Sequence, residues 1–257
     1  MKESRKIIIA VLLVIAVCAG VCVPIAKSQG LLSKGNDIMY SVEKTQALDN
    51  SPIKGKTYIF LGSSVTYGSA AKGESFVDFL EKRDGITAVK EAVSGTCLVD
   101  EKDSSYVSRL KTIDKSINAD AFICQLSTND ATKKKPLGQV SEGFDKNTFD
   151  TKTVAGAIEY IISYVRETWN CPVIFYTGTK YDSKQYEKMI NLLYEIQKKW
   201  DIQILDLWND EDMNSVSKED YRLYMANGIH PTRAGYREWW LPKFEAQLYM
   251  GGNKNER

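Results

Sequence analysis

Hydrophobic and polar positions from residue 55 onward follow two alternating patterns. Short runs of aromatic and β-branched residues, bounded by glycine, proline or polar residues, predict strands at 57–61, 87–93, 119–126, 172–177 and 202–207. Segments with apolar residues three and four positions apart predict helices at 75–82, 106–117, 153–169, 186–200 and 231–249. Strands that alternate with helices in this way predict an α/β fold, with a parallel sheet between two layers of helices.

A different pattern precedes this region, because residues 7–26 form an uncharged apolar run behind Lys2, Arg5 and Lys6. A helix of this length spans about 30 Å, the hydrocarbon thickness of a bilayer. Basic residues before a membrane span favour a cytoplasmic start, so we expect the rest of the chain outside the membrane. A cleaved and secreted form stays open as the alternative. The predicted organisation is a cytoplasmic stub at 1–6, a transmembrane anchor at 7–26, a polar tether at 27–54, a globular domain at 55–250 and a polar tail at 251–257.

Composition and charge narrow the function classes. The chain has 257 residues, enough for one sizeable α/β domain together with the anchor. Its net charge of +1 gives no electrostatic reason to expect a nucleic-acid partner. A single histidine excludes a histidine-rich metal site, and no metal or cofactor is expected. Cys18 and Cys22 fall in the apolar run, so Cys97, Cys124 and Cys171 allow at most one disulfide in the domain.

Polar segments follow the first three predicted strands, where the active site of an open α/β sheet is expected. Ser64 lies in Gly-Ser-Ser-Val-Thr-Tyr-Gly after the first strand, Gly95 in Ser-Gly-Thr after the second, and Asn129 in Ser-Thr-Asn-Asp after the third. A fourth segment, Asn-Gly-Ile-His-Pro-Thr, places His230 before the last helix. Each segment alone is typical of a turn or a helix cap. A serine nucleophile needs a neighbouring base, and His230 is the only histidine available.

In this order, the four segments resemble the motif blocks of the SGNH (GDSL-type) hydrolases, and the resemblance covers about residues 58–236. It implies a flavodoxin-like three-layer α/β/α domain with the activity of a serine esterase. On this resemblance Ser64 matches the nucleophile and His230 matches its base. The oxyanion hole would consist of the backbone N–H groups of Ser64 and Gly95 together with the side-chain amide of Asn129. Such fixed donors stabilise the tetrahedral intermediate of acyl transfer.

The sequence departs from the family at two positions. The residue before the nucleophile is usually aspartate and here is Ser63, which we expect to be tolerated. The position three residues before the histidine, usually the aspartate of the triad, is Asn227. Neutral asparagine supplies no charge to the imidazolium and can hold the wrong tautomer, and in a chymotrypsin-type protease the same exchange lowers kcat by about 10⁴. Another acceptor for His230 could be a backbone carbonyl or one of the carboxylates near it in the sequence, Asp206, Asp210, Glu211 and Asp212.

These observations predict a membrane-anchored, extracytoplasmic esterase that hydrolyses short acyl esters through a Ser-His acyl-enzyme mechanism. The export signal and the range of the family favour an acylated carbohydrate of the cell envelope as substrate. An enzymatic alternative is hydrolysis of a lysolipid or another acyl ester by the same chemistry. A second alternative is a binding domain with weakened catalysis, for which Asn227 is the main argument.

Overall fold

The computed structural model describes residues 32–252, so the predicted stub and anchor lie outside the described residues. Between residues 32 and 252, no helix is both long and apolar enough to cross a membrane. The same part of the chain contains a parallel sheet with the strand order β2-β1-β3-β4-β5. Its strands are β1 (Thr57–Gly62), β2 (Thr87–Ala92), β3 (Ala121–Gln125), β4 (Val173–Tyr176) and β5 (Gln203–Leu205). This order is that of flavodoxin-like folds, in which the functional site is expected at the carboxyl ends of β1 and β3.

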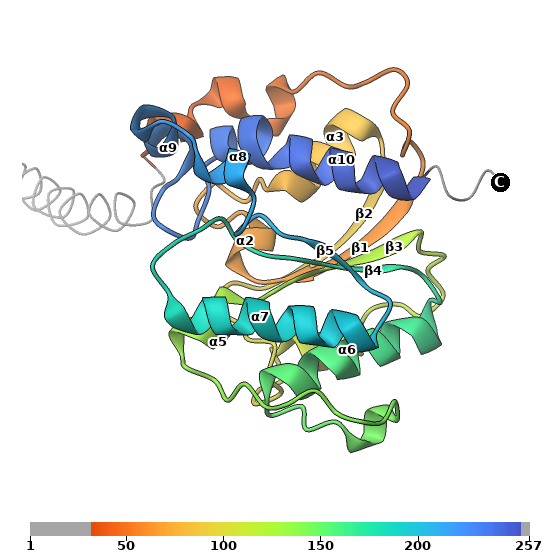
Figure 1. Ribbon diagram of the computed structural model, residues 1–257. Coiled ribbons are helices and arrows are strands. Elements are labelled where there is room, and N and C mark those ends of the chain that lie inside the picture. Colours follow the sequence, from red (N-terminus) through yellow and green to blue (C-terminus); the bar gives the residue numbers. More distant parts are fainter. Residues whose placement is uncertain (1–31, 253–257) are drawn as a thin grey trace, which may run out of the picture.

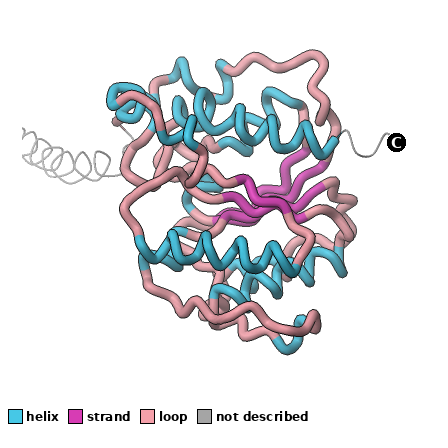
Figure 2. Tube along the Cα trace, in the orientation of Figure 1, coloured by secondary structure: helices cyan, strands magenta, loops and turns pink. Residues whose placement is uncertain are grey.

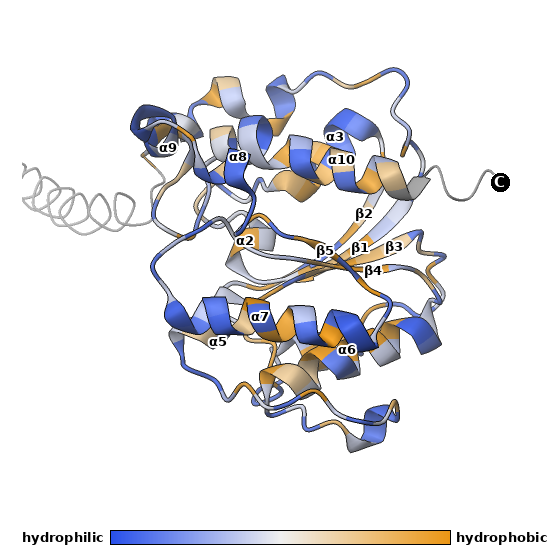
Figure 3. Cartoon of the chain, viewed as in Figure 1, coloured by the Kyte–Doolittle hydropathy of each residue, from blue (hydrophilic) through white to orange (hydrophobic). Residues whose placement is uncertain are grey.

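Helices cover both faces of the sheet (Figures 1 and 2). One layer contains α3 (Phe76–Asp84) and α10 (Leu241–Gly252), and the other contains α6 (Val154–Thr168) and α7 (Lys184–Lys199). Their apolar sides face the sheet and their polar sides face outward (Figure 3). Shorter helices lie in the connections: α2 (Ser64–Tyr67), α4 (Tyr106–Leu110), α5 (Thr128–Thr132), α8 (Glu211–Asn214), α9 (Lys218–Tyr224), the 3₁₀ turns η1 (Lys34–Asn36), η2 (Ile38–Tyr40), η3 (Val42–Lys44) and η4 (Lys146–Thr148), and the π-helical turn η5 (Gly235–Trp240).

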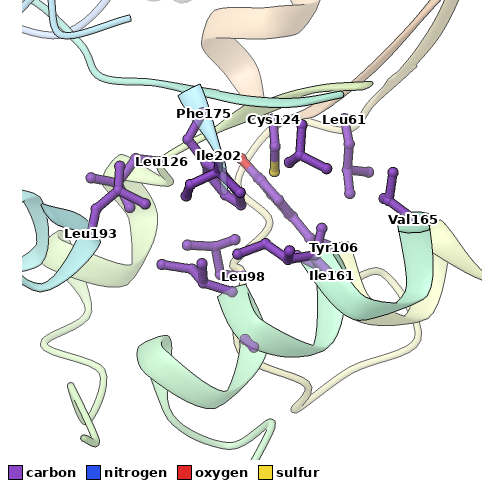
Figure 4. Packing of buried hydrophobic residues seen from close by; sticks show 14 of the residues in the cluster. Leu61, Leu98, Tyr106, Cys124, Leu126, Ile161, Val165, Phe175, Leu193 and Ile202 are labelled. Carbon is purple, nitrogen blue, oxygen red and sulfur yellow. The ribbon is translucent and has the colours of Figure 1, made fainter. Parts of the chain in front are cut away.

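Two hydrophobic cores result, one on each face, because successive side chains of a strand point to opposite sides. Phe60 of β1 belongs to the core under α3 and α10, where the rings of Phe76 and Phe244 stack with centroids 3.8 Å apart. The next residue, Leu61, belongs to the core under α6 and α7, together with Cys124 and other residues labelled in Figure 4. Both cores consist of buried side chains, and each fully buried Leu, Ile, Val or Phe contributes roughly 1.5–3 kcal/mol of transfer free energy. They make the sheet a rigid support for the loops at its carboxyl edge.

Three sequence predictions need correction in detail. The helix predicted at 106–117 ends at Leu110, where Thr112 Oγ1 donates to the carbonyl oxygen of Arg109 at 2.8 Å. The last helix does not begin at Pro231, because that residue forms a β-bridge with Met225 and helical turns begin only at residue 233. Part of the segment predicted as a tether is docked on the domain, since residues 34–44 form three short 3₁₀ turns with buried contacts. The domain cysteines are free and buried.

Candidate active site

Ser64 begins α2 and is separated by one residue from the end of β1, the strand between β2 and β3. Gln125 of β3 fixes the turn into this helix. Its side-chain oxygen accepts hydrogen bonds from Ser63 N and Thr66 Oγ1, both at 2.9 Å. Gly62 is required here because a Cβ atom at this position would collide with the hydroxyl of Thr66. The strand-to-helix turn therefore presents the hydroxyl of Ser64 at the carboxyl edge of the sheet.

His230 meets Ser64 across a sequence separation of 166 residues, with 2.8 Å between Ser64 Oγ and His230 Nε2. The histidine lies in a loop closed by the Met225–Pro231 bridge, in which Ala226 N donates to the carbonyl oxygen of His230 at 2.9 Å. Two separately anchored segments thus bring the hydroxyl and the ring together. The two atoms are hydrogen-bonded at a distance that allows proton transfer between the two groups.

Asn227 lies on the other side of the ring, with 3.0 Å between its Oδ1 and His230 Nδ1. The backbone N–H groups of Ile229 and His230 also donate to this atom, both at 3.0 Å. Because two backbone donors face it, the atom must be the amide oxygen rather than the nitrogen. An oxygen at this place accepts a hydrogen bond from the Nδ1–H group, so Nε2 carries the lone pair that faces Ser64. Asn227 therefore holds the tautomer that a general base needs, and the wrong tautomer considered from the sequence is not the one found.

No charge assists this ring. Among the carboxylates considered as substitutes, Asp206 accepts from Thr177 Oγ1 at 2.9 Å, and Asp210 pairs with Lys243 at 2.6 Å. Within the described residues, neither these two nor Glu211 and Asp212 form a hydrogen bond with His230. Burial lowers the pKa of His230 below its ordinary value, and no carboxylate opposes the shift. The imidazole is consequently neutral at neutral pH.

Asn129 connects the nucleophile turn with the Gly95 loop. Its Nδ2 donates to Ser63 Oγ at 3.2 Å and to the carbonyl oxygen of Thr96 at 3.0 Å, which are the chain neighbours of Ser64 and Gly95. Gly95 has φ +80°, a left-handed conformation that favours glycine, and no atom lies within 4 Å of the place where its Cβ would be. The three segments that the sequence assigned to an oxyanion hole therefore meet beside the serine.

Sequence reasoning missed three charged residues that position these loops. Arg109 is buried and its guanidinium donates to Gly62 O at 2.8 Å and Thr96 Oγ1 at 3.1 Å, linking the end of β1 to the loop that follows β2. Asp130 accepts from the backbone N–H groups of residues 98 and 99 at 2.7 and 3.2 Å, and burial raises the pKa of its carboxyl. Lys133 donates to Gly95 O at 2.8 Å. No spacing in the sequence indicated a role for Arg109. The role of Asp130 could have been predicted, because it directly follows Asn129.

The domain is similar to known proteins in sequence and in fold. The model of the GDSL-like Lipase/Acylhydrolase family matches residues 60–238, more than half of the chain. A structure from Lactobacillus plantarum aligns with a TM-score of 0.61 at 19% identity, covering 77% of this chain and 97% of that one. A GDSL-like lipase from Bacteroides ovatus aligns with a TM-score of 0.56 at 16% identity, covering 77% and 99%.

A family two carbohydrate esterase from Clostridium thermocellum, solved with cellohexaose, aligns with a TM-score of 0.51 at 18% identity, covering 79% of this chain and 66% of that one. At such identities these likenesses concern the fold. No curated protein matches the sequence. With the family match over most of the domain and a serine, a histidine and an asparagine at the carboxyl edge of its sheet, the chain belongs to the GDSL-like lipase/acylhydrolase (SGNH) family of carboxylic ester hydrolases.

Proposed function

We propose that this protein is a membrane-anchored, extracytoplasmic serine esterase that removes short acyl groups, of the acetyl type, from a carbohydrate of the cell envelope. The observation that carries the proposal is the chain of hydrogen bonds from Ser64 Oγ through the ring of His230 to Asn227 Oδ1, at 2.8 and 3.0 Å. It supplies a nucleophile, a base in the correct tautomer and an acceptor that orients the base.

Acylation begins when Ser64 Oγ attacks the carbonyl carbon of the ester and its proton passes to His230 Nε2. The carbonyl oxygen becomes an oxyanion, which the backbone N–H groups of Ser64 and Gly95 and the amide of Asn129 stabilise. The Asn129 N–H groups face Ser63 Oγ and Thr96 O in the absence of substrate, so the oxyanion must compete with these acceptors. Because the bond to Ser63 is the longer of the two, that N–H is the one more easily redirected.

Collapse of the intermediate breaks the bond to the alcohol, and the protonated His230 gives its proton to the departing alkoxide. Water then attacks the acyl-serine with His230 again as base, which releases the carboxylic acid and restores Ser64. Asn227 fixes the ring through both steps but supplies no negative charge to the imidazolium. We therefore propose that catalysis is slower than in an enzyme with aspartate at this position.

Two observations support the substrate and the location. A carbohydrate esterase is among the proteins of similar fold, which favours a saccharide ester. The apolar run at 7–26 behind three basic residues favours an anchor with the domain outside. External protease added to intact spheroplasts should digest the domain, and a domain that is protected until lysis would contradict this orientation.

A binding domain with weakened catalysis is the rival function, favoured by the neutral side chain of Asn227. A fluorophosphonate probe separates the two, because it labels only an activated serine. We expect labelling on the peptide that contains Ser64, and hydrolysis of p-nitrophenyl acetate in preference to long-chain esters. Preference for long chains would favour the lysolipid alternative. Absence of both labelling and hydrolysis would favour the binding domain.

A further inference from the structure

Residues 33–44, here called the N-terminal clasp, pack directly beside the catalytic residues. Gly35 is buried so tightly that a Cβ atom would collide with the carbonyl oxygen of Leu223 and the hydroxyl of Thr232. Thr232 is only two residues beyond His230. Figure 1 shows the first described residues beside α9, at the edge of the sheet where α2 begins. The chain thus enters the domain at its catalytic edge.

Asn36 fastens the clasp to both halves of the site. Its Oδ1 accepts from Arg233 N at 2.9 Å, three residues after His230, and its Nδ2 donates to Ala70 O at 2.7 Å, six residues after Ser64. The residue is 2% exposed, so both bonds are made in buried surroundings, where a hydrogen bond is costly to lose. The path of the clasp is therefore determined by the same segments that carry the nucleophile and the base.

A second set of polar contacts keeps the rest of the clasp in place. Glu74 accepts from Arg233 Nη2 at 2.6 Å and, through its other oxygen, from Val42 N at 2.9 Å. Arg237 Nη1 donates to the carbonyl oxygen of Met39 at 2.6 Å. These bonds, two of them half-buried, hold the three 3₁₀ turns of the clasp in one arrangement on the domain. The outer side chains of the clasp are consequently presented on a defined surface.

Exposed apolar side chains lie on this surface and at Leu32, the residue that directly precedes the clasp. Leu32, Ile38 and Met39, here called the apolar rim, are 64%, 57% and 57% exposed. Six residue steps separate position 26 from Leu32, and at about 3.6 Å per step they span no more than about 22 Å. With the run at 7–26 taken as the proposed anchor, exposed hydrophobic side chains this few residues after it suit the interfacial layer of the bilayer, which takes up amphipathic segments.

We propose that the apolar rim lies in the headgroup layer of the membrane that holds the run at 7–26. In this arrangement the catalytic edge faces the bilayer. The substrate is then a saccharide ester carried on a membrane lipid. The inference rests on the proposed esterase function and on the proposed anchor. The clasp provides the physical link, because it joins the anchor to the segment that follows His230. Substrates free in solution would have to enter between the domain and the membrane.

A fluorescence experiment tests the contact without relying on catalysis. The full-length chain with Cys18 and Cys22 replaced by serine is reconstituted in phosphatidylglycerol–phosphatidylethanolamine vesicles and carries an environment-sensitive dye at Met39→Cys. The remaining cysteines are buried and should react slowly. Phe144→Cys is the matched control, because Phe144 has a similar exposed fraction of 59%. Its ring lies 5.0 Å from the ring of Trp200, measured between centroids. Trp200 follows α7 and precedes β5, so this position is at the opposite edge of the sheet.

Spin-labelled lipid should quench the dye at position 39 and leave the dye at position 144 unchanged, whereas aqueous iodide should do the reverse. Equal quenching by iodide at both positions would overturn the proposal. A second variant carries 30 Gly/Ser residues inserted after residue 28, which adds a flexible spacer of about 30 Å. Its turnover of a lipid-linked acetylated saccharide should fall at least threefold, while its turnover of p-nitrophenyl acetate stays unchanged.

Equal turnover of the lipid-linked ester by parent and spacer variant would also refute the membrane-facing arrangement. If neither protein hydrolyses p-nitrophenyl acetate, the proposed esterase function fails instead, and the quenching result still decides the position of the rim. Replacing Ile38 and Met39 by aspartate should reproduce the effect of the spacer, with Phe144→Asp as the control for a new surface charge.

Discussion

Replacing Asn227 by aspartate should increase the esterase activity, because it places a negative charge beside the ring that becomes positive during the reaction. The oxygen that accepts from Nδ1 and from the two backbone N–H groups would be retained, so the loop has no reason to move. The new second oxygen replaces an amide nitrogen on a side chain that is exposed to solvent. The exchange therefore changes the charge while keeping the geometry of the site.

The magnitude follows from the distance and the exposure. At about 4 Å between charge centres, an ion pair is worth about 1 kcal/mol in water and about 4 kcal/mol at an effective dielectric constant near 20. Asn227 is exposed while Ser64 is 8% exposed, so the gain belongs near the lower end of this range. A stabilisation of about 1.4 kcal/mol corresponds to a tenfold increase in kcat. We expect at least that factor.

The assay is hydrolysis of p-nitrophenyl acetate between pH 5 and 9. Aspartate should raise the pKa of His230, so the acidic limb of the kcat/KM profile should move to higher pH in the variant. Asn227 precedes glycine, a pair prone to deamidation, so intact masses of freshly prepared proteins must be compared before rates are interpreted. A variant no faster than the parent, with an unmoved acidic limb, would show that the charge does not reach the imidazolium and would refute the reasoning.

Four further outcomes follow from the site. Ser64→Ala should abolish hydrolysis and probe labelling while the thermal unfolding temperature stays close to that of the parent; labelling of Ser63 in this variant would identify a different nucleophile. Because burial lowers the pKa of His230, activity of the parent should persist below pH 6.5 and decline only as the imidazole is protonated, and a pH titration of kcat/KM with its midpoint above pH 7 would contradict this. Asn129→Ala should lower kcat on the order of a hundredfold with little change in KM, the effect of losing one oxyanion donor, and an equal rise in KM would assign it a binding role instead. In Arg109→Lys the charge is kept, but the lysine cannot reach all the partners of the guanidinium. The free energy of unfolding in urea should fall by an amount on the order of 1–3 kcal/mol, because buried acceptors are left unsatisfied. An unchanged unfolding midpoint would show that these bonds are replaceable.

The sequence alone determined the class of the fold and the four residues that meet at its edge. Runs of apolar residues locate the strands, because burial between two helix layers requires them, and the parallel order places the ends of β1, β2 and β3 on one edge. Ser64, Gly95 and Asn129 could therefore be placed at one edge from their positions after these strands, while their roles came from the resemblance to the SGNH hydrolases. His230 followed from being the only histidine. Local patterns suffice where a residue's role depends on its place in a strand-loop-helix unit.

Tertiary structure decided what depends on contacts between distant segments. The tautomer of His230 is determined by the side-chain oxygen of Asn227. That this atom is the oxygen follows from the backbone N–H groups of residues 229 and 230, which donate to it. The role of Arg109 depends on reaching Gly62 and Thr96, which lie 47 and 13 positions away. The docking of Asn36 on Arg233 joins positions 197 residues apart. Side chains such as these look like ordinary polar positions in the sequence, because their partners are brought to them only when the sheet and both helix layers have closed.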